Sequence, residues 1–217
     1  MKYFPAFLDL QGRAAVVIGG GRVAERKVLT LLACGARVTV VSPALTPKLS
    51  YLVQAGAIRR YARRWRPADL KEAFLIMATT EDRKANAEIA RQAHENSRLV
   101  NIADDPARCN VITPSVMTRG DLMIAVSTGG KSPALARRIR LELEKSFGAE
   151  YGKFLSILSS VREEVKSRVP SITRRRRILQ RLAASDLLTL LRQGKKKQAK
   201  KRIRQIVGLR NLTLNGY

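Results

Sequence analysis

Short apolar runs alternate with amphipathic stretches over roughly the first half of the chain. The runs are rich in Val, Ile, Leu and Ala, which is typical of strands buried on both faces of a parallel sheet. The stretches between them repeat apolar residues at helical spacing. This alternation predicts an α/β fold with a Rossmann-like, doubly wound parallel sheet. The predicted strands are 14–18, 37–41, 57–61, 73–80 and 99–103, and the predicted helices are 22–34, 45–55 and 82–96.

The pattern changes after the last of these strands. Two apolar runs within 110–126 are separated by Arg119 and Gly120, which predicts a β-hairpin that turns at these two residues. A glycine-containing loop then leads to Ser132 and Pro133, an N-cap residue followed by a residue suited to the first turn of a helix.

Helices alone are predicted from about residue 146 to the end, interrupted at Pro170 and Gly194. This part is also strongly basic. Residues 171–217 contain 14 Lys and Arg and one acidic residue, Asp186, within a chain of net charge +25. Such a surface attracts polyanions. Nucleic acid, an anionic membrane and a small polycarboxylate are all candidates, beside a merely solvated helical face.

Composition limits the class of protein. With 217 residues, 45% of them hydrophobic, the chain can form a sizeable core. Cys34 and Cys109 lie outside any C-x-x-C pair, and His94, the single histidine, is predicted on the surface. A disulfide framework and a metal site are therefore not expected. Because no signal-peptide pattern and no bilayer-length apolar run occurs, a cytoplasmic protein without a membrane partner is expected.

A glycine motif at the end of the first predicted strand points to a dinucleotide. Gly19, Gly21 and Ala24 form G-x-G-x-x-A between an apolar strand and an amphipathic helix. Gly19 permits a tight turn, Gly21 lets a pyrophosphate approach the backbone, and Ala24 allows close packing of helix and strand. The free N–H groups and positive dipole end of the helix would then face the phosphates.

The acid that usually contacts the adenosine ribose is missing. An Asp or Glu is expected about 20 residues after the motif. Here the second strand ends in VVSPA, where Ser42 offers only an uncharged hydroxyl. Arg22 and Arg37 are nearby in sequence and would suit a 2′-phosphate. These residues leave NAD and NADP both open.

Polar residues follow two other predicted strands. Thr79 and Thr80 end the fourth strand, where their hydroxyls would face the cofactor or cap the strand. Asp104 and Asp105 follow the fifth strand. Two adjacent acids there would supply a general base for a dehydrogenase, or form an Asx turn before Pro106.

A second glycine loop, STGGKSP at 127–133, resembles an anion cradle ahead of a helix, although it lacks the spacing of a Walker A motif. A plain loop that leads into a helix is the alternative. The G-x-S-x-G elbow of α/β hydrolases is absent, which disfavours a Ser-His-Asp hydrolase.

Four segments in order resemble the N-terminal module of siroheme synthase, a family of precorrin-2 dehydrogenases of which some are also sirohydrochlorin ferrochelatases. The segments are PAFLDLQGRAAVVIGGGRVAERK, ATTEDR, VNIADDPARCNVITPSV and RGDLMIAVSTGGKSPALARRIR, and they cover about residues 3–145. The resemblance implies NAD-dependent oxidation of precorrin-2 to sirohydrochlorin. In some members insertion of Fe(II) follows.

The resemblance also implies roles for individual residues. Asp104 matches the catalytic aspartate, which would handle protons of the macrocycle. Some iron-inserting members have Ser in place of Thr128, so iron insertion stays open. The predicted cofactor site combines implied contacts with the motif residues: Gly19, Gly21, Arg22, Val23, Ser42, Pro43, Ala44, Thr79 and Thr80. Predicted substrate contacts are Asp105, Ser127, Thr128, Gly129 and Lys131.

A polycarboxylate substrate gives the positive charge a purpose. Precorrin-2 and sirohydrochlorin each carry eight carboxylates, which a basic cleft would concentrate. The basic residues nearest to the predicted site in sequence are Arg119, Lys131, Arg137 and Arg138.

The resemblance further implies a homodimer in which residues 114–145 provide much of the interface, and three parts are expected along the chain. These are an NAD-binding Rossmann domain at 1–113, a small α+β dimerisation region at 114–145 and a basic helical C-terminal domain at 146–217. Nucleic acid is not expected as a partner of such an enzyme. Two alternatives remain: an NAD-sensing regulator whose basic tail binds nucleic acid, and a structural NAD-binding subunit without catalysis.

Overall fold

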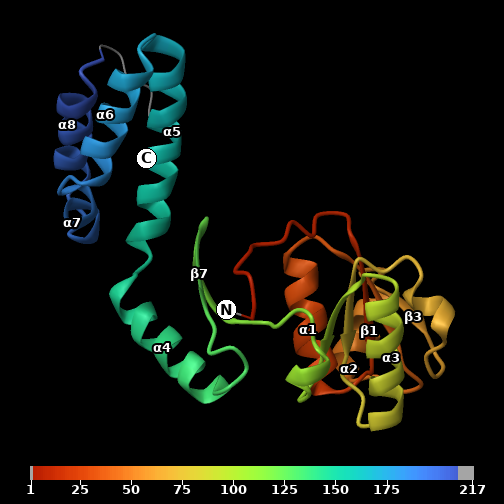
Figure 1. The fold of residues 1–217 in the computed structure, drawn as a ribbon. Helices are drawn as coiled ribbons and strands as arrows, with labels where there is room; N and C mark the ends of the chain where they lie inside the picture. Colours follow the sequence, from red (N-terminus) through yellow and green to blue (C-terminus); the bar gives the residue numbers. More distant parts are fainter. Residues whose placement is uncertain (1, 210–217) are drawn as a thin grey trace. The chain divides into compact units, whose positions relative to one another are not determined.

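The computed structural model describes residues 2–209 and divides the chain into two compact units, Met1–Thr113 and Pro114–Tyr217. Figure 1 draws both units as ribbons coloured along the sequence. The first unit is an α/β domain, and the second is a β-hairpin followed by helices. The predicted further boundary between residues 145 and 146 lies within the second unit and stays a prediction.

Five parallel strands form the sheet of the first unit in the order β3-β2-β1-β4-β5. The strands are β1 (Ala14–Ile18), β2 (Arg37–Val41), β3 (Arg59–Tyr61), β4 (Leu75–Ala78) and β5 (Leu99–Ile102). The order reverses at β1, whose Ile18 is paired with Val41 of β2 on one side and Ala78 of β4 on the other. Ligands of doubly wound sheets bind at such a switch point, beyond the carboxyl ends of the strands. The predicted fold class is confirmed.

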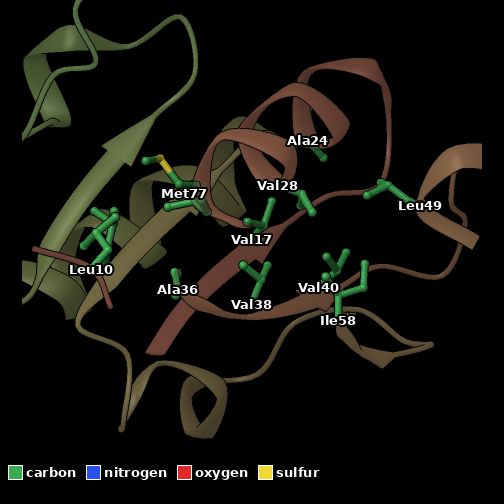
Figure 2. Close-up of a cluster of buried hydrophobic side chains, with 13 residues drawn as sticks. Leu10, Val17, Ala24, Val28, Ala36, Val38, Val40, Leu49, Ile58 and Met77 are labelled. Atoms are coloured by element: carbon green, nitrogen blue, oxygen red, sulfur yellow. The ribbon is translucent and has the colours of Figure 1, made fainter. Parts of the chain in front are cut away.

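Helices cover both faces of this sheet, and each face has its own hydrophobic core. On one face α1 (Arg22–Ala33) and α2 (Pro47–Gln54) contribute Val28 and Leu49, both fully buried, to a cluster with Val17 and Val40 (Figure 2). On the other face Ile89 of α3 (Arg83–Glu95) joins a second cluster. Short 3-10 turns, η1 (Pro67–Leu70) and η2 (Pro106–Arg108), follow β3 and β5.

The second unit begins with the predicted hairpin, β6 (Ser115–Arg119) and β7 (Leu122–Val126). Arg119 pairs with Leu122, so the turn lies at Gly120 and Asp121, one residue later than predicted. Gly120 has φ +58°, and a Cβ built on it would lie 3.3 Å from the Cα of Gly152. Because glycine has no Cβ, the turn can pack directly against the backbone of the helix that contains Gly152.

Five helices follow the hairpin as far as residue 209. The loop after β7 leads into α4 (Pro133–Ser146), whose N-cap Ser132 accepts a hydrogen bond from the Leu135 N–H, as predicted. The next helices are α5 (Glu150–Arg168), α6 (Ile172–Ala183), α7 (Leu187–Arg192) and α8 (Lys196–Val207). Their apolar faces meet in a third core that contains Val161, Leu182 and Ile203, all fully buried.

Candidate functional site

The glycine turn between β1 and α1 has three glycines with three different constraints. Gly19 has φ +116°, and a Cβ there would lie 2.5 Å from the Thr79 hydroxyl oxygen. A Cβ on Gly20 would lie 1.9 Å from the Ala44 carbonyl oxygen. A Cβ on Gly21 would meet no described atom within 4 Å. Gly19 and Gly20 are thus required by the protein's own packing, whereas Gly21 faces open space.

Gly21 is also the N-cap of α1, and no side chain of the described residues caps this helix. The N–H groups of its first turn therefore keep their capacity to donate hydrogen bonds to an anion, at the positive end of the helix dipole. Ala24 is fully buried against the sheet, so the helix axis lies close to β1. Open backbone above Gly21 and free helical N–H groups together form a suitable seat for a pyrophosphate.

The loop after β2 is held in place by an arginine that sequence reasoning missed. Arg60 of β3 donates hydrogen bonds to the carbonyl oxygens of Ser42 (3.3 Å) and Pro43 (2.7 Å). The buried Ser42 hydroxyl donates to the Ala44 carbonyl at 2.7 Å. Arg60 therefore shapes the predicted ribose loop. In the sequence, Arg60 occupies only an alternating position of a predicted strand, where an arginine is expected to be solvent-exposed.

Arg37 does not belong to this edge of the sheet. It begins β2, and its guanidinium donates to the Gly12 carbonyl oxygen at 2.9 Å, so it lies at the amino end of the strands. The interpretation of Arg37 as a contact for a 2′-phosphate is therefore wrong, since cofactors of such sheets bind at the carboxyl end. Arg22, in the first turn of α1, is exposed on the correct side.

The hydroxyl groups of the two threonines after β4 both donate hydrogen bonds within the protein. Thr79 Oγ1 donates to the Ile18 carbonyl oxygen at 3.0 Å, which ties β4 to the end of β1. Thr80 Oγ1 donates to the side-chain oxygen of Asn86 at 2.9 Å, and Asn86 donates back to the Thr80 carbonyl. Each hydroxyl oxygen keeps acceptor capacity toward a ligand.

Asp104, directly beyond β5, has φ +59°, a left-handed backbone conformation that few residues other than glycine adopt. Its side chain is exposed and forms no ion pair or hydrogen bond with any residue of the described chain. Asp105 instead forms an ion pair with Arg108. The expected pair of adjacent free carboxylates is thus replaced by one free acid, Asp104, and one neutralised acid.

Cys109 anchors the loop that carries Asp104. Its buried sulfur accepts a hydrogen bond from the Ile102 N–H at 3.1 Å and lies 3.2 Å from the Asp105 carbonyl oxygen, to which the thiol donates. Burial raises the pKa of this thiol, which keeps it protonated and able to donate. The Cys109 side chain therefore contacts the backbone on both sides of Asp104, at Ile102 and at Asp105.

A lysine on α1 supports the same loop from the other end. Lys27 Nζ donates to the Asn101 side-chain oxygen at 3.3 Å and to the Thr113 hydroxyl at 2.5 Å. Asn101 in turn donates to the Val111 carbonyl at 3.1 Å. Burial lowers the pKa of Lys27, and the neighbouring Arg26 adds to the effect. The helix that begins at the glycine turn is thus bonded to the loop of Asp104.

The glycine loop of the second unit is closed on itself. Thr128 Oγ1 donates to the Ser132 carbonyl and accepts from the Ser132 N–H, both at 3.0 Å. Ser127 Oγ accepts from the Gly129 N–H at 3.1 Å. Lys131 is exposed and has no ion-pair partner in the described chain. The loop therefore presents Lys131 on a rigid turn.

Arg119 and Arg138 do not supply free charge to a cleft. The Arg119 guanidinium donates to the carbonyl oxygens of Phe147 (2.9 Å) and Glu144 (3.4 Å), which caps the end of α4. Arg138 is paired with Glu142. Of the four predicted basic residues, Lys131 and Arg137 remain exposed and without an ion-pair partner among residues 2–209.

His94 is exposed on α3, as predicted, with its ring next to the Arg108 carbonyl. Within the described residues, no three His, Cys, Asp or Glu side chains gather in a way that would hold a metal ion. Likewise, between residues 2 and 209 no helix is long and apolar enough to cross a membrane.

Three family models match consecutive parts of the chain. Residues 6–115 match a family described as putative NAD(P)-binding, residues 119–146 match the sirohaem biosynthesis protein central region, and residues 150–207 match the sirohaem synthase dimerisation region. The first match alone covers half of the chain and contains the glycine turn and Asp104.

Curated relatives and a solved structure agree with these matches. The chain is 40% identical to the siroheme synthase of Thioalkalivibrio sulfidiphilus over 92% of its own length and 41% of the relative's. It is also 40% identical to siroheme synthase 1 of Aeromonas salmonicida, over 87% of its own length and 40% of the relative's. The chain thus spans about two fifths of the curated relatives it matches.

The solved structure is that of SirC, a precorrin-2 dehydrogenase. It superposes with a TM-score of 0.79 at 28% identity, and the match covers 93% of this chain and 99% of that one. The chain therefore belongs to the putative NAD(P)-binding family and continues, as sirohaem biosynthesis proteins do, with a central and a dimerisation region.

Proposed function

We propose that this chain is an NAD-dependent precorrin-2 dehydrogenase that forms sirohydrochlorin in siroheme biosynthesis. The observation that carries the proposal is Asp104, a free carboxylate in a strained left-handed conformation beyond the sheet that bears the glycine turn. Strained backbone that the surrounding contacts over-determine is characteristic of functional sites. The likeness to precorrin-2 dehydrogenase over nearly the whole chain supplies the substrate class.

The reaction removes two electrons and two hydrogens from the macrocycle. NAD, when bound, accepts one hydrogen with both electrons as a hydride. Asp104 accepts the other hydrogen as a proton, since its carboxylate is exposed and unpaired among the described residues. The N–H groups at the start of α1 would hold the pyrophosphate beside Gly21, and the Lys27 and Cys109 contacts hold the loop of Asp104.

NAD rather than NADP is proposed as the cofactor. Arg60, the basic residue that contacts the ribose loop, already donates to two backbone carbonyls. Its donors are thus occupied within the protein and are poorly placed to hold a 2′-phosphate. The remaining predicted cofactor contacts, from Gly19 to Thr80, and the substrate contacts at Asp105, Ser127, Thr128, Gly129 and Lys131 form part of this proposal.

A homodimer is proposed through the hairpin. Val116 and Met123 are 40% and 45% exposed on one face of β6 and β7, where Ala125 and Thr118 are also exposed. An apolar face on a two-stranded sheet is costly in water, and a second copy would cover it. Sedimentation at micromolar concentration tests this, and a monomer would contradict it. The cytoplasm is the proposed compartment because its reducing conditions suit two free cysteines.

The experiment is an anaerobic assay of the purified protein with precorrin-2 and NAD, followed by absorbance. Sirohydrochlorin formation that needs NAD is the expected result. Asp104→Asn is the matched control: it should bind NAD and form no product. A second arm adds Fe(II) to ask whether this chain also inserts the metal. NAD binding without turnover in the native protein would contradict the dehydrogenase and favour a non-catalytic subunit.

A further inference from the structure

The last helices carry a strongly charged surface that the proposed reaction does not use. Among the exposed basic residues of α6 and α8 that form no ion pair with a described acidic residue, six recur along one stripe of each helix. They are Arg174, Arg177 and Arg181 of α6 and Lys197, Lys201 and Arg204 of α8, and we call this surface the α6–α8 face. Asp186, the one acid of this part of the chain, is already paired with Arg202.

The three arginines of α6 border a groove together with the buried Ile178, whereas the three cations of α8 lie on the side of that helix away from the buried Ile203. In each helix these cations recur at spacings of three, four and seven residues, which places them on one stripe. The buried Ile178 and Leu182 lie on the stripe of α6 next to the arginines, and the buried Ile203 lies on the far side of α8 from its three cations. Helical geometry therefore concentrates the positive charge along two neighbouring helices, which lie side by side in Figure 1.

The face is hollowed where the helices meet. The start of α6 and the end of α8 enclose a groove of about 380 Å³. Its lining combines Arg174, Arg177 and Arg181 with two hydroxyl residues, Ser171 and Thr173, and with the apolar Ile178, Ile206 and Val207. Lys197, Lys201 and Arg204 line a second hollow on α8. Guanidinium groups and hydroxyls around a concave surface are the donors that bind phosphate groups.

The dimerisation region that matches residues 150–207 includes α6 and α8, but the α6–α8 face itself does not suit contact with its own copy. In a two-fold dimer the same patch can meet itself, and six cations would then oppose six cations.

A membrane does not suit the α6–α8 face either, because Ile172 is the one large apolar residue of the described parts of α6 and α8 that is strongly exposed. The residues 172–207 contain no Phe, Tyr or Trp on which unpaired bases could stack.

We propose that the α6–α8 face binds double-stranded nucleic acid through its phosphate backbone, without reading the base sequence. Such binding needs an array of cations and no aromatic platform, and this is the arrangement that α6 and α8 present. The inference revises the expectation that nucleic acid is not a partner of this protein. It is independent of the proposed dehydrogenase, whose residues lie elsewhere in the chain.

The test measures binding of the full chain to a fluorescent 20-bp DNA duplex of arbitrary sequence between 50 and 300 mM NaCl. Each phosphate that the protein neutralises adds about −0.9 to the slope of log K against log salt, so six neutralised phosphates predict a slope of about −5. The variant R174E/R177E/R181E should reduce the magnitude of the slope by about 3 and weaken binding at least tenfold at 100 mM NaCl.

A matched control carries the same change of charge elsewhere. R59E/R64E/K71E alters three exposed cations of the first unit and should leave most of the binding intact. If this control weakens binding as much as the α6 variant does, binding depends on net charge alone and the assigned face is wrong. Circular dichroism checks that both variants fold, and R174Q/R177Q/R181Q replaces the α6 variant if it does not.

Two further probes separate the duplex from other polyanions. Tighter binding to a single strand of the same length would contradict recognition of a duplex. Stronger binding to vesicles of phosphatidylserine and phosphatidylcholine would contradict nucleic acid as the partner and favour a membrane. Absence of duplex binding at 50 mM NaCl would overturn the proposal outright. NAD binding measured in parallel should be the same in all variants.

Discussion

Lys27 of α1 and Asn101 of β5 are joined by a hydrogen bond of 3.3 Å between the lysine Nζ and the amide oxygen. The bond links the helix that begins at the glycine turn to the strand that ends at Asp104. Two segments that are 74 residues apart in sequence, one with the proposed cofactor seat and one with the proposed base, thereby share one side-chain contact.

The substitution Lys27→Met tests this link through pH. Burial lowers the pKa of Lys27, so folding disfavours its charged form. The penalty is present in full below the folded pKa and vanishes above the unfolded value of 10.5, because there the lysine is neutral in both states. As the pH rises through this window, the free energy of unfolding of the native protein should increase relative to that of the variant. Urea titrations between pH 7 and 10 measure it, and parallel pH profiles would contradict the lowered pKa.

The two glycines Gly20 and Gly21 should respond oppositely to alanine. Gly20→Ala places a methyl group against the Ala44 carbonyl and should lower the melting temperature by several degrees. Gly21→Ala adds a methyl group in open space, so the protein should fold normally and bind NAD at least tenfold more weakly. Thermal melts and calorimetric NAD titrations measure the two effects. Normal NAD affinity in Gly21→Ala would refute the proposed pyrophosphate seat.

Asp104→Asn should abolish turnover without loss of stability. Asparagine tolerates the left-handed conformation and therefore keeps the backbone of the loop. Asp104→Ala changes the same carboxylate but should also cost about 1 kcal/mol of stability, since alanine is strained at φ +59°. Activity assays and denaturant melts of both variants separate chemistry from folding. Substantial activity in Asp104→Asn would show that the proton goes elsewhere.

The two cysteines should differ in reactivity toward iodoacetamide. Cys34 is exposed, whereas Cys109 is buried and burial raises its pKa. Because the thiolate is the reactive form, the native protein at pH 7.5 should be alkylated once, at Cys34, and a second time only after unfolding. Mass spectrometry of intact protein and peptides reports both sites. Prompt alkylation of Cys109 would show that the loop of Asp104 opens readily.

Tetrapyrrole binding should weaken with salt more steeply than NAD binding. An octacarboxylate meets more cations than a pyrophosphate does. Lys131→Gln/Arg137→Gln should flatten the salt dependence for sirohydrochlorin, because these two side chains are exposed and lack ion-pair partners in the described chain. Arg138→Gln is the control, since Arg138 is paired with Glu142. Anaerobic absorbance titrations provide the affinities, and equal salt slopes for both ligands would count against a basic cleft.

The strands and helices of the first unit could be predicted from the sequence because their signals are local. An apolar run followed by glycines and an amphipathic helix is sufficient to place β1, the turn and α1. The Ser132 cap of α4 is equally local. The hairpin turn shifted by one residue because its register depends on the pairing of Arg119 with Leu122.

The partners of polar side chains were not predictable in the same way. Arg119 resembles a substrate contact in sequence, but it donates to carbonyls 25 and 28 residues away. Arg60 and Lys27 carry no motif, and they act through contacts made only after the sheet has formed. A long polar side chain can satisfy its hydrogen bonds in many directions, so its partner is set by tertiary structure.

The hydrophobic clusters of the sheet and of helices α5 to α8 share no residue. Mutations that loosen the helical cluster should therefore leave the packing around the glycine turn intact, and mutations in the clusters of the sheet should leave the helical cluster intact. A change of charge on the outer surface of the last helices should therefore leave the packing that anchors β1 and β5 undisturbed.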